Sequence, residues 1–103
     1  MTASRTSQAQ PTVQVDNDRV KGTEWRFAPG AETGHHVHAH DYVVVPLTSG
    51  VLRLEEGGGA REAQLTSGVA YARQKGVTHN VINGNDFEFR FLEIERLSPQ
   101  GSR

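Results

Sequence analysis

Turn-forming residues recur about every eight to twelve positions along this chain, and the segments between them are short. Pro29-Gly30 and Ser49-Gly50 are two such turn signals, and the Gly57–Gly59 run is a third. Within the segments, apolar and polar residues alternate, which predicts strands with one buried face because successive side chains in a strand point to opposite sides. No stretch has a sustained apolar period of about 3.6 residues. The sequence therefore predicts an all-β fold with no substantial helix.

We expect strands at residues 12–15, 20–28, 36–47, 51–55, 60–65, 69–72, 79–82 and 87–97. Short antiparallel strands hide their edges by forming a two-sheet sandwich or a closed barrel. A chain of 103 residues is long enough for one core but too short for two domains. We expect residues 12–98 to form this single β-barrel domain, between a flexible N-terminal tail at 1–11 and a short polar tail at 99–103.

Charge and composition exclude several classes of function. The formal charge is −1, with 11 Lys and Arg residues scattered along the chain, so no basic patch predicts nucleic-acid binding. No apolar run approaches the roughly 18 residues of a membrane helix, and no secretory signal precedes the domain, so we expect a cytoplasmic protein that binds no membrane. Because the chain has no cysteine, any metal would be held by histidine, carboxylate or water.

Four of the five histidines lie within residues 30–50. In a continuous strand one face would carry His36, His38, His40 and Tyr42. Neutral imidazole is the commonest metal ligand in proteins, and two imidazoles at i and i+2 are about 6.6 Å apart at their Cα atoms. Three histidines on one face of a strand predict a metal site. Clustered histidines are, however, also found as solvated residues at the rim of a protein and as members of hydrogen-bond networks. A third ligand from elsewhere would have to be His79, the remaining histidine.

Two segments resemble the motifs of the cupin 2 conserved-barrel family. The first motif is Gly, five residues, His-x-His, three or four residues, Glu, six residues and Gly, and it is matched at Gly30, His36, His38 and Gly50. The second is Gly, five residues, Pro-x-Gly, two residues, His, three residues and Asn, and it is matched at Gly68, Gly76, His79 and Asn83, with Gln74 replacing the proline. Residues 40–47 and 76–83 are also similar to small cupins attributed to β-alanine catabolism.

The resemblance implies a cupin-type jelly-roll β-barrel of two antiparallel sheets in Greek-key order. It also implies that His36, His38 and His79 bind one divalent transition metal per chain, and Fe(II), Mn, Ni and Zn are all compatible with imidazole. The motif glutamate is missing, because its position falls on Tyr42 or Val43 under the two allowed spacings. His40 is a candidate fourth metal ligand, and Tyr42 and His40 are the candidate catalytic residues.

Four further residues are candidates for lining a pocket for an acidic ligand, since arginine binds carboxylates bidentately: Tyr42, Tyr71, Arg73 and Arg90. The more ordinary interpretation of each is a surface or rim residue. Phe87, Phe89, Phe91 and Trp25 are more typical of a core than of a cofactor site. We also expect a homodimer that pairs through one face of the final strand.

These patterns favour a metal-dependent protein that acts on a small polar metabolite. If it is an enzyme, the resemblance suggests a dioxygenase-type oxidoreductase or an isomerase that uses the metal as a Lewis acid. The missing glutamate leaves a second hypothesis open, in which the barrel is a non-catalytic small-ligand-binding or sensory module with a partial or absent metal site. A structural barrel with vestigial histidines is the third.

Overall fold

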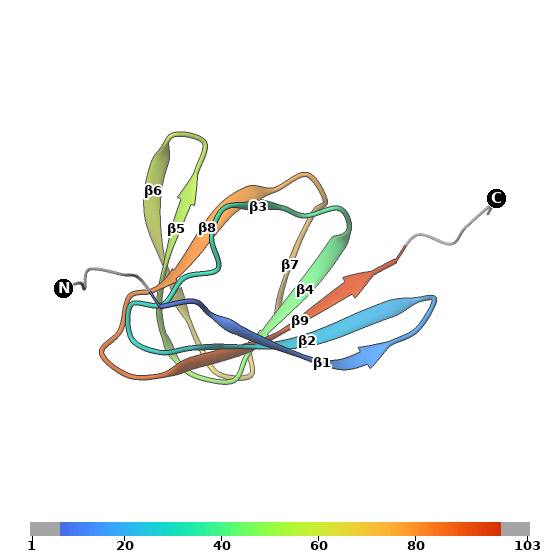
Figure 1. The fold of residues 1–103 in the computed structure, drawn as a ribbon, viewed down its shortest axis with the longest axis horizontal. Coiled ribbons are helices and arrows are strands. Elements are labelled where there is room, and N and C mark those ends of the chain that lie inside the picture. The colour runs from blue at the N-terminus through green and yellow to red at the C-terminus, as the bar shows by residue number, and fades with distance from the viewer. Residues whose placement is uncertain (1–6, 98–103) are drawn as a thin grey trace.

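The computed structural model describes residues 7–97, and within this range every regular element is a strand (Figure 1). The expected C-terminal tail and most of the expected N-terminal tail lie outside the described residues. The strands are β1 (Gln10–Asp16), β2 (Val20–Phe27), β3 (His36–Val37), β4 (Asp41–Pro46), β5 (Gly50–Glu56), β6 (Gly59–Leu65), β7 (Tyr71–Arg73), β8 (Thr78–Asn83) and β9 (Phe89–Arg96). The predicted all-β fold without helix is confirmed.

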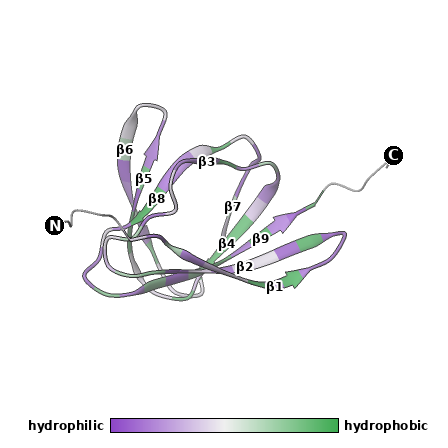
Figure 2. Ribbon diagram, in the orientation of Figure 1, coloured by the Kyte–Doolittle hydropathy of each residue, from purple (hydrophilic) through white to green (hydrophobic). Residues whose placement is uncertain are grey.

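The strands form two antiparallel sheets that face each other. One sheet has the order β1-β2-β9-β4-β7 and the other has the order β3-β8-β5-β6. Bands of different hydropathy succeed one another along β2, as expected for a strand with one inward face (Figure 2). Most neighbours in a sheet are not consecutive in the chain, so the chain crosses repeatedly from one sheet to the other.

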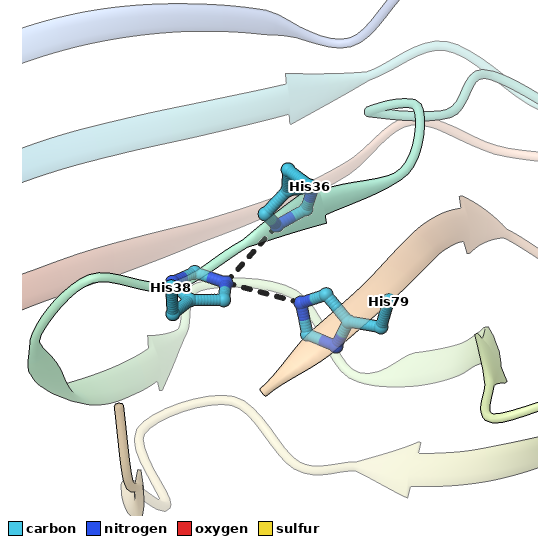
Figure 3. A group of neighbouring side chains, drawn as sticks. All are labelled: His36, His38 and His79. Atoms are coloured by element: carbon cyan, nitrogen blue, oxygen red, sulfur yellow. Dashed lines mark hydrogen bonds between the residues drawn. The ribbon is translucent and has the colours of Figure 1, made fainter. Parts of the chain in front are cut away.

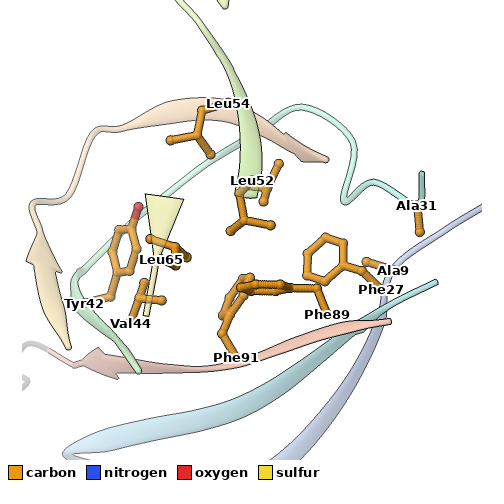
Figure 4. Close-up of a cluster of buried hydrophobic side chains, with 11 residues drawn as sticks. Ala9, Phe27, Ala31, Tyr42, Val44, Leu52, Leu54, Leu65, Phe89 and Phe91 are labelled. Atoms are coloured by element: carbon orange, nitrogen blue, oxygen red, sulfur yellow. The ribbon is translucent and has the colours of Figure 1, made fainter. Parts of the chain in front are cut away.

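The core lies between the two sheets. Phe27 and Phe89 are completely buried, and the rings of Phe27 and Phe91 pack with their centroids 5.4 Å apart (Figure 4). Leu52 and Val81 contribute from the opposite sheet. Part of this apolar cluster, including Leu52, Val81 and Phe91, lines the same cavity as the histidines.

Three expected boundaries are wrong. The strand expected at 36–47 is divided: β3 belongs to the four-stranded sheet and β4 to the five-stranded one, with a bend at Ala39 and His40 between them. The first strand begins before residue 12, because β1 starts at Gln10, and Ala9 just before it is buried. The last strand begins at Phe89 rather than at Phe87, whose side chain is 44% exposed.

The two motif positions Gly50 and Asn83 are explained by close packing. A Cβ atom at Gly50 would lie 2.8 Å from the side-chain oxygen of Asn85, so a larger residue would push Asn85 out of its hydrogen bonds to Val51. The amide nitrogen of Asn83 donates hydrogen bonds to the carbonyl oxygens of Phe27, Ala28 and Phe87, while its oxygen accepts one from the backbone of Asn85. Asn83 therefore ties the end of β8 to the segments that follow β2 and precede β9.

Candidate metal centre

The pairing of β3 with β8 brings the three motif histidines together. His36 lies directly opposite His79 in this ladder. His38 follows β3, and its backbone is held by the segment that leads into β8: its N–H donates to the Val77 carbonyl at 2.9 Å, and its own carbonyl accepts from the N–H of Gly76 at 2.7 Å. One short ladder therefore fixes the positions of all three imidazoles.

The three rings point their Nε2 atoms toward one another (Figure 3). The Nε2 atom of His38 lies 3.0 Å from that of His36 and 3.1 Å from that of His79. His38 and His79 are each only 5% exposed, and His36 is half-buried. The rings stand edge to face, with centroids 4.7 to 5.0 Å apart. The three ring nitrogens thus meet at one point inside the barrel.

A hydrogen bond at Nδ1 determines which ring nitrogen of His36 carries the proton. Its Nδ1 lies 2.9 Å from the carbonyl oxygen of Gly34, and since a carbonyl only accepts, Nδ1 must donate. A neutral His36 then carries a bare lone pair on Nε2. Gly34 is held in turn by Asn80, whose side-chain oxygen accepts from the Gly34 N–H at 2.9 Å. Asn80 therefore orients His36 through the loop before β3.

His79 is backed by a carboxylate. Its Nδ1 lies 3.5 Å from Oε2 of Glu56, a distance too long for a well-formed hydrogen bond but close enough for the carboxylate charge to attract an N–H at Nδ1. The same carboxylate oxygen lies 3.3 Å from the Arg73 guanidinium and 3.7 Å from that of Arg61. These cations lower the pKa of Glu56 and keep it ionised. The arrangement favours a proton on Nδ1 of His79 and a free lone pair on Nε2.

Burial keeps two of the rings neutral. It lowers the pKa of His38 to about 4, and the neighbouring His36 and His79 add to the effect. Burial likewise lowers the pKa of His79 to about 4, with Glu56 opposing part of the shift. At neutral pH both side chains are therefore unprotonated, which is the form that binds metal.

The geometry fits a transition metal. Metal–imidazole bonds are about 2.0–2.1 Å long, so two such ligands at a right angle lie about 3.0 Å apart. The observed Nε2 separations of 3.0 and 3.1 Å match that spacing. Second partners on the outer ring nitrogens, here Gly34 and Glu56, are also typical of metal-binding histidines.

The imidazoles line a small cavity in the barrel. Its free space is about 20 Å³, enough for about one water-sized group. It opens toward a wider hollow of about 400 Å³ at the mouth of the barrel. Both spaces are lined by Trp25, Thr33, His36, His38 and Glu93. A small ligand that enters through the mouth would therefore reach the histidines.

Two of the buried polar atoms without a hydrogen-bond partner are donors that line this cavity. They are the Tyr42 hydroxyl and the Trp25 indole N–H. Burial raises the pKa of Tyr42 to about 12, so its phenol keeps its proton and is available as a donor. Tyr42 also stacks on His38, with ring centroids 3.9 Å apart. The cavity thus offers donors for an oxygen-bearing ligand.

The structure separates the other sequence-predicted residues. Tyr71 and Arg73 line the inner cavity with Tyr42, whereas Arg90 lies on the outer surface and pairs with Glu24 at 2.8 Å. Arg90 therefore lines neither of these two spaces. His40 was expected on the inner face, but the bend after β3 places it outside both groups of side chains that could hold a metal within residues 7–97. His40 is not a fourth ligand in this arrangement.

Sequence reasoning missed two acidic residues at the site, Glu56 and Glu93. Glu93 lies in β9, and burial together with Glu95 raises its pKa to about 7. Possible ligand atoms of His38, Glu93 and Glu95 all lie within 4.8 Å of one another. The alternation in β9 contained a signal, because Glu93 has the same parity as the buried Phe89 and Phe91. Glu56 had no such signal, since its contact with His79 depends on tertiary structure.

Comparison with known proteins agrees with this geometry. Residues 23–95 match the family described as the cupin domain. The chain belongs to the cupin family. It is 64% identical over 88 residues to the β-alanine degradation protein BauB of Pseudomonas aeruginosa, which covers 85% of this chain and 93% of that protein. The predicted resemblance to small cupins of this kind is confirmed.

Solved structures show the same fold. A cupin domain from Bordetella pertussis Tohama I is 57% identical, with a TM-score of 0.91 over 93% of this cupin and all of that chain. A cupin superfamily protein from Desulfitobacterium hafniense is 16% identical, with a TM-score of 0.70 over 94% of this cupin and 84% of that chain, and it supports the fold alone. The expected jelly-roll barrel of two antiparallel sheets is confirmed. The described part of this cupin contains no helix that could span a membrane.

Proposed function

We propose that this cupin binds one divalent transition metal through His36, His38 and His79 and uses it on a small polar metabolite. The observation that carries the proposal is the convergence of three Nε2 atoms at separations of 3.0 and 3.1 Å. Fe(II), Mn, Ni and Zn all accept imidazole ligands, so the identity of the metal is left to measurement.

A hydrogen-bond network among the rings explains the cluster less well. His36 has its proton on Nδ1, so its Nε2 can only accept. A single proton on Nε2 of His38 can be aligned with one neighbour but not with both, which leaves the Nε2 lone pair of the other neighbour without a donor. A cation between the rings would accept all three lone pairs, and burial has already removed the competing protons from His38 and His79.

The residues around the histidines suggest how a small ligand is held. When bound, a divalent metal with three imidazole ligands and open positions would supply Lewis-acid or dioxygen chemistry. Tyr42 and Trp25 would donate hydrogen bonds to an oxygen of the ligand in the inner cavity. Arg73 adds positive charge at the same wall, although it is already paired with Glu56. The likeness to BauB supports a metabolite of β-alanine degradation as the substrate.

Metal analysis tests the proposal directly. Protein purified without tags or chelators is measured by inductively coupled plasma mass spectrometry, before and after anaerobic loading with Fe(II) or Mn(II). We expect about one equivalent per chain in the wild type and a sharp loss in His36→Ala and His79→Ala. His35→Ala is the matched control, because His35 is adjacent to the site but exposed.

The opposite result would favour the second function. If the wild type takes up no metal under any loading condition, or if His35→Ala and His79→Ala lose equal amounts, the three-histidine site is refuted. The non-catalytic binding module would then be the better reading, because Tyr42 replaces the motif glutamate and the cavity with its unpartnered donors remains. Ligand screening would be the next step.

We also propose that the protein is a homodimer. The outward face of the five-stranded sheet leaves Val43 37% exposed and Ile94 36% exposed, and these two residues are paired across β4 and β9. An apolar pair in the middle of a sheet face is a suitable centre for an isologous contact. A monomeric mass by light scattering at micromolar concentration would refute the dimer.

A further inference from the structure

The motif position that supplies a carboxylate in the family pattern supplies none here. Val43 points outward and is 37% exposed. Tyr42 points inward, is 3% exposed and stacks on His38. A divalent cation held only by three neutral imidazoles would keep its full charge in a buried site, which is unfavourable without a nearby anion.

The neighbouring strand places a carboxylate at the same location. β9 pairs with β4, and Glu93 lies opposite Val44 in this ladder. Glu93 lines the inner cavity together with all three histidines. A carboxylate oxygen of Glu93 and a ring nitrogen of His38 lie within 4.8 Å of each other. Glu93 therefore shares with the imidazoles the cavity in which a metal would lie.

Glu93 has no other partner that would explain its position. Its cross-strand neighbours are Thr23 in β2 and Val44 in β4, neither of which is charged. Among residues 7–97 no Lys or Arg nitrogen lies within 4.0 Å of Glu93, whereas Glu56 contacts two arginines. Placing an unpaired carboxylate in a cavity is costly, and a cation bound there would offset that cost.

Glu95 is less suitable although it belongs to the same acidic group. It lies one step further along β9, where its direct neighbours are Lys21 in β2 and Tyr42 in β4. It lines the outer hollow but not the inner cavity that contains the histidines. Glu95 therefore faces the mouth beside a lysine, while Glu93 faces the imidazoles.

We propose that Glu93 is the fourth protein ligand of the metal centre and supplies, from β9, the carboxylate that the motif position lacks. The inference rests on the proposed function and adds to it a ligand outside both sequence motifs. The four ligands would then be His36, His38, His79 and Glu93, from three separate parts of the chain.

Cobalt binding by matched variants tests the assignment. Glu93→Gln and Glu95→Gln each remove one negative charge with little change in shape, and circular dichroism and urea unfolding check that both fold. Co(II) affinity is measured by competition with a chromophoric chelator, and the visible spectrum of bound Co(II) reports its ligands. We expect Glu93→Gln to weaken binding by about 10- to 100-fold or more and to change the spectrum, and Glu95→Gln to weaken binding much less and to leave the spectrum unchanged.

The outcomes separate the two proposals. Unchanged affinity and spectrum in Glu93→Gln would overturn the assignment and leave the three-histidine site intact. Equal losses in the two variants would also overturn it, because they would indicate a general effect of negative charge at the mouth. A wild-type chain that binds no Co(II) would instead refute the proposed function itself.

Discussion

Replacing Glu56 by glutamine tests whether the carboxylate behind His79 tunes the metal centre. Oε2 of Glu56 lies 3.5 Å from Nδ1 of His79 and is held there by Arg73 at 3.3 Å. Glu56→Gln keeps the shape but removes the charge that favours a proton on Nδ1 and electron density on Nε2. Removal of such partners typically weakens metal binding by about 10- to 100-fold, or about 1.4–2.7 kcal/mol. We expect a loss in this range.

The pKa of His79 shows which mechanism would cause the loss. Because that pKa is about 4, His79 is already neutral at pH 7, and competition by protons contributes almost nothing to the apparent affinity there. Removing Glu56 would lower the pKa further, since Glu56 favours the protonated ring. The loss of metal affinity in Glu56→Gln should therefore be the same at pH 7 and pH 8. Such a loss would reflect a change in the orientation and basicity of the His79 imidazole.

Zinc affinity is measured by chelator competition at both pH values. Glu62→Gln is the matched control, because it removes the same charge from an exposed position in β6. The reasoning is refuted if Glu56→Gln binds zinc within about twofold of the wild type, or if its loss equals that of the control. A loss that disappears between pH 7 and pH 8 would indicate proton competition instead.

Two further predictions concern the metal-free protein. Folding lowers the pKa values of His38 and His79 from 6.5 to about 4, so below about pH 6.5 the unfolded chain binds protons that the folded protein does not. The contribution of these two residues to the free energy of unfolding is therefore full above about pH 6.5 and is lost as the pH falls toward 4. We expect the free energy of unfolding, measured with urea in the presence of a chelator, to fall by a few kcal/mol between pH 7 and pH 4. The raised pKa of Glu93 acts in the opposite direction and offsets part of this loss. A free energy of unfolding that does not change over this pH range would contradict the prediction. Asn83→Ala should destabilise the fold by about 2–4 kcal/mol, because it removes the side-chain donor to the carbonyls of Phe27, Ala28 and Phe87, of which Ala28 keeps a backbone hydrogen bond from Ala31. A change below about 1 kcal/mol in urea unfolding would contradict this prediction.

Alternation of side chains was enough to predict the fold class and most strands, but it could not reveal the break between β3 and β4. Every second residue from His36 to Tyr42 is a histidine or tyrosine, so a pattern of neighbouring residues predicts one continuous strand. The backbone of His38 is instead bonded to Gly76 and Val77, far away in the sequence. The parity argument consequently succeeded for His38 and Tyr42 and failed for His40, which lies in the bend.

The start of the first strand was missed for a different reason. Every residue of β1 is exposed, so this edge strand has no buried apolar stripe that a pattern could detect. Its place in the sheet comes from backbone pairing with β2. The charged residues at the centre escaped notice because pattern analysis treats Glu93 as surface, although its parity with Phe91 places it inside.

Burial keeps the histidines neutral and so able to bind a metal, and it also explains why acidic residues lie around them. A cavity that is apolar enough to keep His38 and His79 neutral disfavours every charge within it, including that of a divalent cation. Glu56 stands behind His79, and Glu93 lies near His38 on the opposite sheet. Two carboxylates on two sides would balance the charge of one divalent ion. A cavity built to bind only a neutral ligand would gain nothing from Glu93, so its presence among the imidazoles favours a metal centre.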